Sequence, residues 1–177
     1  MQPVIYDVAV SIDGYIAGLD GDVSLFAHHG PVVDDYQSRL ATYSTAIMGR
    51  QTYEFGYRFG LEPGQNPYPN MKTFVVSDTL KLPNDRAIDV LQGETALALC
   101  QLKTDAAGPI YLCGGGEFAG YLLELNLIDK LVLKRAPIIL GEGTRLFGRT
   151  RSKLAFAHTG TKNYDGGYVL QQFDLVG

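Results

Sequence analysis

An apolar run, three consecutive glycines and a segment with helical periodicity follow one another over residues 110–127. Residues 110–113 predict a buried strand, residues 114–116 a tight turn, and residues 117–127 a helix. The helical segment places four apolar residues at core spacing, namely Phe118, Tyr121, Leu122 and Leu125. Because a strand that turns directly into a helix is a building unit of α/β proteins, this segment limits the fold class more than any other part of the chain.

Strands and helices alternate through the rest of the chain. Further strands are predicted over residues 4–10, 45–48, 73–76, 87–90 and 131–140, and further helices over residues 33–43, 51–55 and 94–103. Residues 154–175 predict a hairpin with its turn near residues 163–167. This order indicates an α/β fold whose sheet is mostly parallel with an antiparallel edge. Since no linker divides the sequence, we expect a single domain over residues 1–177.

Composition excludes several classes of partner and location. The chain has 15 Lys and Arg against 19 Asp and Glu, a formal net charge of −4, and no run rich in Lys or Arg, so neither nucleic acid nor a membrane surface is expected as a partner. No stretch approaches the roughly 20 apolar residues of a membrane span, and the first residues lack the features of a signal peptide. Cys100 and Cys113 are too few for a disulfide scaffold and lack metal-ligand spacing. We therefore expect a cytoplasmic protein without a metal.

Residues suited to phosphate binding stand at three predicted strand ends. The glycines at 114–116 allow a ligand close to the backbone, and the helix after them offers free N–H groups with partial positive charge. Arg50 and Ser77 follow the ends of two other strands. Two plainer interpretations stay open, in which the glycines only permit tight packing and Arg50 only pairs with Glu54. Because ligands of open α/β sheets bind at the carboxyl ends of the strands, three such ends together favour a dinucleotide site.

Several motifs in a fixed order resemble the dihydrofolate reductase-like family. They are SIDGYIA at residues 11–17, MGRQTYE at 48–54, KTFVVS at 72–77 and LCGGG at 112–116. Residues 122–147, with LID at 127–129 and PIILGEG at 137–143, are similar to the branch that contains the reductase domain of bacterial riboflavin biosynthesis, the RibD C-terminal domain. The resemblance covers roughly residues 3–175.

This resemblance implies a three-layer α/β/α fold around a mixed, mostly parallel sheet of eight strands. It also implies an NADPH-dependent reductase, often a homodimer, that transfers a hydride to a small pterin-, pyrimidine- or carbonyl-like substrate. The alternative from another class is a nucleotide-binding dimer without catalytic activity. A reductase oxidises NADPH when given a substrate, whereas a binding protein only binds it.

The resemblance also assigns residues to parts of the cofactor. Ala9 and Ile16 would border the nicotinamide, and Ser77 would lie near the 2′-phosphate. The adenosine-side phosphates would be held by Arg50 and Thr52, and Gly49 is also expected to bind the cofactor. The pyrophosphate would be received by the backbone N–H groups of Gly114, Gly115, Gly116 and Glu117.

Three carboxylates are candidates for the proton donor. Folate-reducing members carry an acid on the first helix, and counting back from the MGR motif points to Asp34 or Asp35. Acids at a helix start are also stabilised by the helix dipole without any catalytic role. Asp13 lies in the loop expected to cover the nicotinamide, where it is either a catalytic acid or a turn-forming residue. Water is the remaining alternative.

The chain departs from its relatives at positions that bear on specificity. Asp78 stands where many relatives have an arginine, which disfavours contact with a 2′-phosphate. Tyr15 and Cys113 replace a basic and an acidic residue of the riboflavin-pathway reductases, which argues against their phosphoribosylamino-pyrimidine as the substrate. Aromatic residues around the predicted loop at 56–70, such as Tyr53 and Phe55, either stack on a flat ring or pack the loop.

Overall fold

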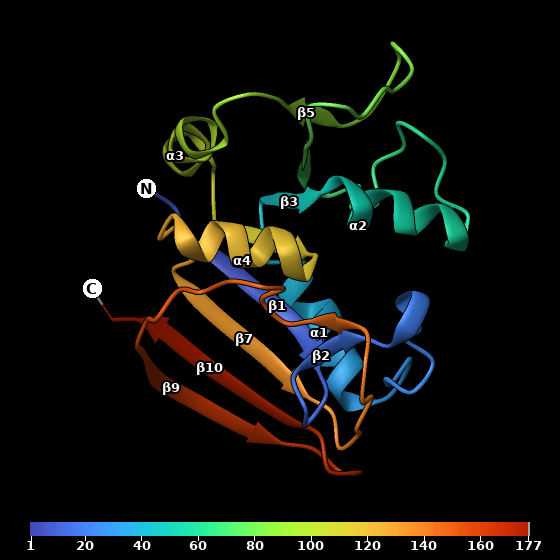
Figure 1. The fold of residues 1–177 in the computed structure, drawn as a ribbon, viewed down its shortest axis with the longest axis vertical. Helices are drawn as coiled ribbons and strands as arrows, with labels where there is room; N and C mark the ends of the chain where they lie inside the picture. The colour runs from blue at the N-terminus through green and yellow to red at the C-terminus, as the bar shows by residue number, and fades with distance from the viewer. Residues whose placement is uncertain (177) are drawn as a thin grey trace.

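Residues 1–176 are described by a computed structural model, in which eight strands form one sheet in the order β5-β4-β3-β6-β1-β7-β10-β9 (Figure 1). The strands are β1 (Val4–Val10), β3 (Thr45–Gly49), β4 (Lys72–Val76), β5 (Asp89–Leu91), β6 (Ile110–Gly114), β7 (Lys130–Arg135), β9 (Phe156–Asn163) and β10 (Val169–Leu175). β10 pairs antiparallel with both β7 and β9, and the other pairs are parallel. The predicted mixed, mostly parallel eight-stranded sheet with a C-terminal antiparallel hairpin is confirmed. The predicted domain over residues 1–177 includes Gly177, which lies outside the described residues.

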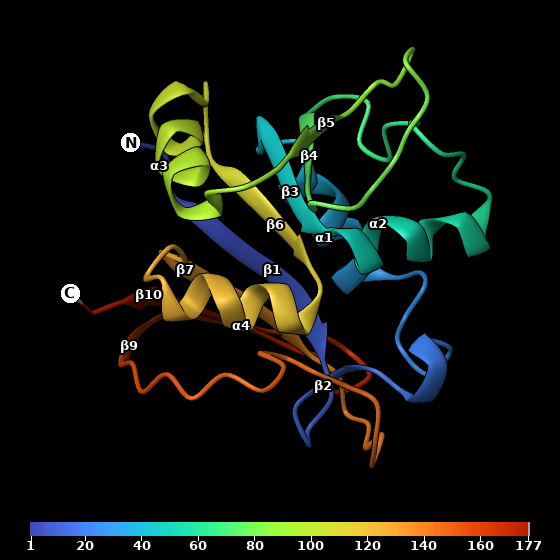
Figure 2. The same cartoon turned by 45° about the horizontal axis from the view of Figure 1, so that its top comes forward.

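Helices cover both faces of the sheet, as the predicted three-layer fold requires. Their bounds are α1 (Pro31–Leu40), α2 (Arg50–Phe55), α3 (Thr95–Asp105) and α4 (Gly116–Glu124), with short 3-10 turns η1 (Leu19–Gly21) and η2 (Gly56–Phe59). Figure 2 shows α3 and α4 on one face and α1 behind the sheet. Within residues 1–176, every helix is too short or too polar to cross a membrane.

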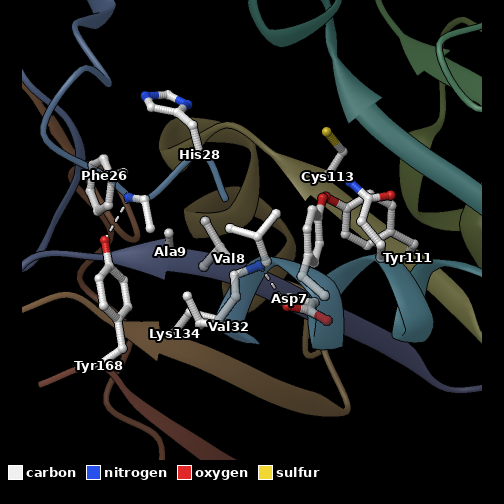
Figure 3. Close-up of a pocket in the computed structure, with 14 residues that line it drawn as sticks. Asp7, Val8, Ala9, Phe26, His28, Val32, Tyr111, Cys113, Lys134 and Tyr168 are labelled. Atoms are coloured by element: carbon white, nitrogen blue, oxygen red, sulfur yellow. Dashed lines mark hydrogen bonds and ion pairs between the residues drawn. The ribbon is translucent and has the colours of Figure 1, made fainter. Parts of the chain in front are cut away.

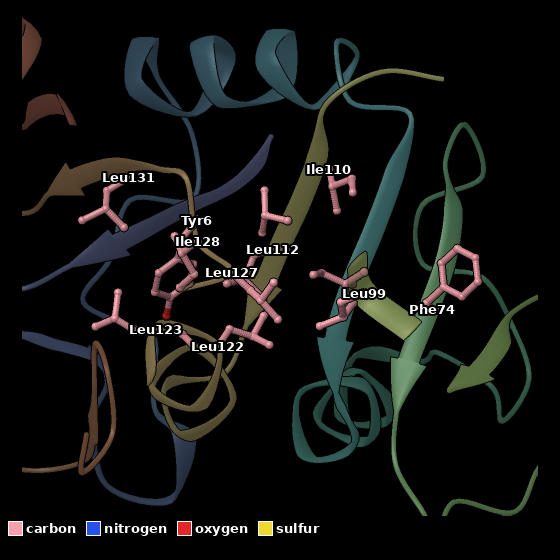
Figure 4. Close-up of a cluster of buried hydrophobic side chains, with 13 residues drawn as sticks. Tyr6, Phe74, Leu99, Ile110, Leu112, Leu122, Leu123, Leu127, Ile128 and Leu131 are labelled. Carbon is pink, nitrogen blue, oxygen red and sulfur yellow. The ribbon is translucent and has the colours of Figure 1, made fainter. Parts of the chain in front are cut away.

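Alternation along the central strands divides the core between the two faces. Tyr6 of β1 and Leu112 of β6 are fully buried and pack against Leu122 of α4 (Figure 4). The neighbouring residue Tyr111 points to the other face, where it packs with Tyr36 of α1. Because successive side chains of a strand point to opposite faces, the apolar runs of these strands supply both halves of the core.

Several boundaries differ from the sequence prediction for local reasons. The strand predicted over residues 131–140 ends at Arg135, because Pro137 cannot donate a backbone hydrogen bond. The helix predicted over residues 117–127 ends at Glu124, and Asn126 adopts a left-handed conformation with φ of 55°.

A second, two-stranded sheet was not predicted. β2 (Tyr15–Ala17) pairs antiparallel with β8 (Thr144–Arg145) and joins the loop after β1 to the segment after β7. Strands of two and three residues are too short to show an alternating pattern, and their pairing depends on contacts between distant parts of the chain.

The start of α4 packs tightly against the backbone of the segment around β8. A Cβ atom on Gly116 would lie 1.9 Å from the carbonyl oxygen of Arg145, and one on Gly120 would lie 2.3 Å from that of Phe147. Since real Cβ atoms essentially never approach other atoms this closely, glycine at these two positions allows the helix and the segment to touch.

Candidate functional site

Two cavities lie near the carboxyl ends of the central strands. The larger has a volume of about 550 Å³ and the smaller about 330 Å³. Val8 of β1 and Cys113 of β6 line both cavities, so the two spaces meet at these residues. A ligand in one cavity would therefore lie next to a ligand in the other.

The larger cavity brings together most of the residues that the resemblance assigns to the cofactor. It is lined by Ile16, Gly49, Arg50, Thr52, Gly115, Gly116 and Glu117, among others. Ala9 lines the smaller cavity instead, whereas Gly114 and Ser77 line neither. The strand ends of a parallel sheet meet at one edge, which explains why residues at the ends of β3 and β6 converge here. Ile16 comes from β2, which belongs to the separate two-stranded sheet.

The turn before α4 forms a cradle for a small charged group. Gly114 has φ of 130°, the Gly114–Gly115 peptide bond is cis, and a Cβ on Gly115 would lie only 2.9 Å from the hydroxyl oxygen of Thr52. Gly115 caps the nine-residue α4, whose first N–H groups have no acceptor within the helix. Space without side chains, a hydroxyl and free N–H groups at a helix start together fit a phosphate group.

The other two phosphate candidates already have partners within the protein. Arg50 donates from Nε to Glu54 Oε1 at 2.9 Å and from Nη1 to Thr79 Oγ1 at 2.7 Å, while it still lines the larger cavity. The hydroxyl of Ser77 accepts from the backbone N–H of Leu80 at 3.0 Å and of Thr79 at 3.2 Å, so it holds the turn after β4.

Asp78 is turned toward the loop before α3. Its carboxylate accepts from the backbone N–H of Gly93 at 2.8 Å. This bond gives Asp78 a local structural role.

The smaller cavity has a buried ion cluster in its wall (Figure 3). Asp7 of β1 is 1% exposed and accepts from Arg39 Nε at 2.8 Å, Lys134 Nζ at 2.9 Å and the Tyr43 hydroxyl at 3.1 Å. Sequence reasoning missed this cluster. The available signal was a carboxylate inside the apolar run at residues 4–10 and a lysine inside the run at 131–136.

Tyrosine hydroxyls and a thiol form a second group beside this cavity. The Tyr36 and Tyr111 hydroxyls are hydrogen-bonded to each other at 2.6 Å, and the Tyr68 hydroxyl lies 3.1 Å from Cys113 Sγ. Burial raises the pKa of all three phenols and of the Cys113 thiol. These groups therefore stay protonated and neutral near pH 7.

Asp13 lies outside both cavities and closes a loop. Its carboxylate accepts from the Ser11 hydroxyl at 2.5 Å and from the backbone N–H of Gly141 at 2.7 Å and Leu140 at 3.2 Å. The Ser11 hydrogen bond is the main reason why the pKa of Asp13 is lowered. The arrangement favours the turn-forming interpretation of Asp13.

Asp34 and Asp35 also lie outside both cavities. Asp34 is exposed, whereas Asp35 accepts from Lys162 Nζ and from the Tyr164 hydroxyl at 2.7 Å. Asp35 thus links α1 to the β9–β10 hairpin. The hydrogen bond from Lys162 and, after it, that from Tyr164 lower the pKa of Asp35.

We expect acid to weaken this link between α1 and the hairpin. A lowered pKa in the folded state means that Asp35 stabilises the fold above the unfolded-state value of about 4, and that this stability is lost as pH falls through the lower folded-state value. Asp35→Asn should therefore melt at a lower temperature than Asp34→Asn at pH 6. The difference between the two melting temperatures should disappear at low pH. Thermal unfolding of both variants from pH 6 to pH 2.5 measures this. A difference in melting temperature that is the same at every pH would contradict the stabilising role of the ionised Asp35.

The two aromatic residues named for these roles lie in different surroundings. The Tyr53 hydroxyl donates to the carbonyl of Gln65 at 2.9 Å and accepts from the N–H of Gly64 at 2.8 Å, so Tyr53 packs the loop. Phe55 lines the larger cavity.

The chain is similar to known proteins along almost its whole length. The family model of the RibD C-terminal domain matches residues 2–170. YwjB of Bacillus subtilis (strain 168), an uncharacterized protein, is 28% identical over 164 residues, which cover 92% of each chain.

Solved structures share the fold at lower identity. A putative riboflavin biosynthesis protein from Shewanella sp. PV-4 superposes with a TM-score of 0.83, 23% identity and full coverage of both chains. Dihydrofolate reductase from Enterococcus faecalis, complexed with NADP(H) and RAB-propyl, superposes with a TM-score of 0.72 and 15% identity, covering 99% of this chain and 97% of the other. These likenesses show the fold.

Proposed function

Because the chain belongs to the RibD C-terminal domain family, we propose that it is an NADPH-dependent reductase of a small pterin-, pyrimidine- or carbonyl-like molecule. One observation carries the proposal. Two cavities meet at Val8 and Cys113, and the larger of them has a turn at Gly115 that fits a phosphate. A reductase of this kind needs adjoining sites for a nucleotide and a substrate.

In this proposal the larger cavity holds the nucleotide. The N–H groups at the start of α4 and the Thr52 hydroxyl would hold the pyrophosphate, and Arg50 would contact a further phosphate. That the Enterococcus faecalis reductase of the same fold is complexed with NADP(H) supports this choice of cofactor. When bound, a reduced nicotinamide supplies a hydride. The protein binds and orients both partners and excludes water between them.

The smaller cavity would hold the substrate. Since Asp13, Asp34 and Asp35 lie outside it, we place the proton donor among the protonated groups of this cavity or its water. The protein is proposed to act in the cytoplasm as a homodimer.

The test is the affinity for NADPH and NADH, measured by calorimetry on the wild type and Arg50→Ala. Loss of a charge-assisted phosphate contact of about 1.5–3 kcal/mol should weaken NADPH binding by about 10- to 100-fold. Arg151→Ala removes an exposed arginine that lines neither cavity and should leave the affinity unchanged.

The possible results separate the competing interpretations. If neither nucleotide binds at millimolar concentration, the reductase proposal is wrong. If NADPH binds but no pterin, pyrimidine or carbonyl compound causes its oxidation, the nucleotide-binding alternative is favoured. Equal weakening of NADPH and NADH by Arg50→Ala would assign Arg50 to a phosphate that both nucleotides carry.

A further inference from the structure

Lys134 of β7 is an unusual residue for the wall of an otherwise aromatic and apolar cavity. It is 7% exposed, it donates to Asp7 Oδ1 at 2.9 Å, and its Nζ lies 3.5 Å from the centroid of the Tyr36 ring. An ammonium group has three N–H donors. Within residues 1–176 its interactions are one hydrogen bond and one ring face, which leaves a donor for a ligand in the cavity that Lys134 lines.

The charges around this cavity do not balance. Asp7 carries one negative charge, whereas Lys134 and Arg39 beside it carry two positive charges. The Asp35 carboxylate also acts on Arg39, but it is itself paired with Lys162. Of the described residues that line the cavity, Asp7 alone has a carboxylate. The other titratable groups there are His28, Cys113, Tyr36, Tyr111 and Tyr168. Near pH 7 the cluster therefore leaves a net positive charge in a poorly solvated place, which favours an anion.

The side chains in the walls of the cavity also restrict the shape of the ligand. Phe26 and Tyr111 present rings to a space of about 330 Å³, and Val32 adds apolar surface (Figure 3). Tyr36 and Val33 also line this space. Such walls suit a flat ring system, because aromatic faces stack well and exclude water.

We propose that the smaller cavity takes a flat ring compound with an anionic oxygen, and that Lys134 binds this oxygen and so determines specificity. The inference rests on the proposed function, in which this cavity holds the substrate. It narrows the substrate class from pterin-, pyrimidine- and carbonyl-like molecules to those that carry an acidic group. A ring that becomes cationic on binding is disfavoured, because no carboxylate in the described wall is free of a cationic partner.

Burial gives the proposal a pH signature. Desolvation lowers the pKa of Lys134 in the free protein, whereas a bound anion stabilises its charged form. Binding of an anion should therefore weaken as pH rises through the pKa of Lys134, because the neutral amine no longer attracts the anion.

The experiment uses two flat two-ring probes that differ in charge, 2-naphthoate and its neutral analogue 2-naphthamide. Affinities are measured by calorimetry without nucleotide for the wild type, Lys134→Met, Lys134→Arg and Lys130→Met. Lys130 is a matched control on the same strand, where it pairs with Asp174 outside the cavity. Thermal unfolding of each variant checks that it is folded.

We expect the wild type to prefer naphthoate. Lys134→Met should weaken naphthoate binding by about 10- to 100-fold, as the loss of a charged hydrogen bond does, and change naphthamide binding little. Lys134→Arg should keep the preference and remove its decline with rising pH, because arginine stays charged. Lys130→Met should behave like the wild type.

Three results would overturn the inference. The first is that the wild type binds the two probes with equal affinity. The second is that Lys134→Met weakens the binding of both probes by the same factor. The third is that the affinity of the wild type for naphthoate does not change with pH. Because no nucleotide is present, failure here leaves the NADPH result standing. Conversely, a protein that prefers naphthoate but binds no NADPH would keep the anion site and lose the reductase proposal.

Discussion

Asp7→Ala is expected to lower the free energy of unfolding by about 3–5 kcal/mol, the usual effect of removing one partner from a buried ion cluster. The carboxylate has four hydrogen bonds to Arg39, Tyr43 and Lys134. Without it, two positive charges remain side by side in a poorly solvated wall. Urea denaturation followed by circular dichroism at pH 7 measures the change.

The exposed pair of Lys130 and Asp174 provides the control for this prediction. It has a similar distance, 2.8 Å, but both side chains are more than 40% exposed. Asp174→Ala should therefore cost at most about 1 kcal/mol. If Asp7→Ala costs no more than Asp174→Ala, the buried cluster does not stabilise the fold in the way described.

Gly116→Ala is expected to destabilise the protein by about 1–3 kcal/mol or more and to weaken nucleotide binding at the same time. The new Cβ would lie 1.9 Å from the carbonyl oxygen of Arg145 and 3.3 Å from the backbone nitrogen of Gly148. Both are backbone atoms, so the steric clash can be removed only if the 145–148 segment or the start of α4 moves. Thermal unfolding and NADPH calorimetry on one sample measure both effects.

Gly160→Ala is the matched substitution for comparison. It lies on β9, and its new Cβ would meet Gln172 at an ordinary contact distance of 3.4 Å. The change in stability should be small. If the Gly116→Ala protein is as stable as Gly160→Ala, the segment around β8 can move without a loss of folding stability, which would contradict this prediction.

The fold was accessible from sequence because its central strands carry local signals. Apolar runs at β1, β3 and β6, each followed by glycine or polar residues, predict strands that end at one edge. The β2–β8 pairing was inaccessible for the opposite reason, because Ala17 and Thr144 have no local pattern and meet only in the folded chain.

The candidate site was accessible in part for the same reason. Residues assigned to the cofactor converge because the ends of parallel strands converge. The charged residues inside two apolar runs were a signal for the buried cluster, but their pairing had no local sign, since Asp7 and Lys134 are 127 residues apart. The three predicted acids failed to reach the cavities because charge alone does not say which way a loop or helix face points. Asp35 turns toward the hairpin, whereas its neighbour Tyr36 lines the smaller cavity.

The narrow overlap between the two cavities has a consequence for divergence. The shared lining consists of Val8 and Cys113, while α1, β7 and the hairpin contribute only to the smaller cavity. Substitutions at positions such as Lys134 or Val33 can therefore change which molecule is accepted while the nucleotide side keeps its residues. We expect related chains to differ most in the residues that line the smaller cavity. The residues that line the larger cavity should therefore be the better guide to common ancestry.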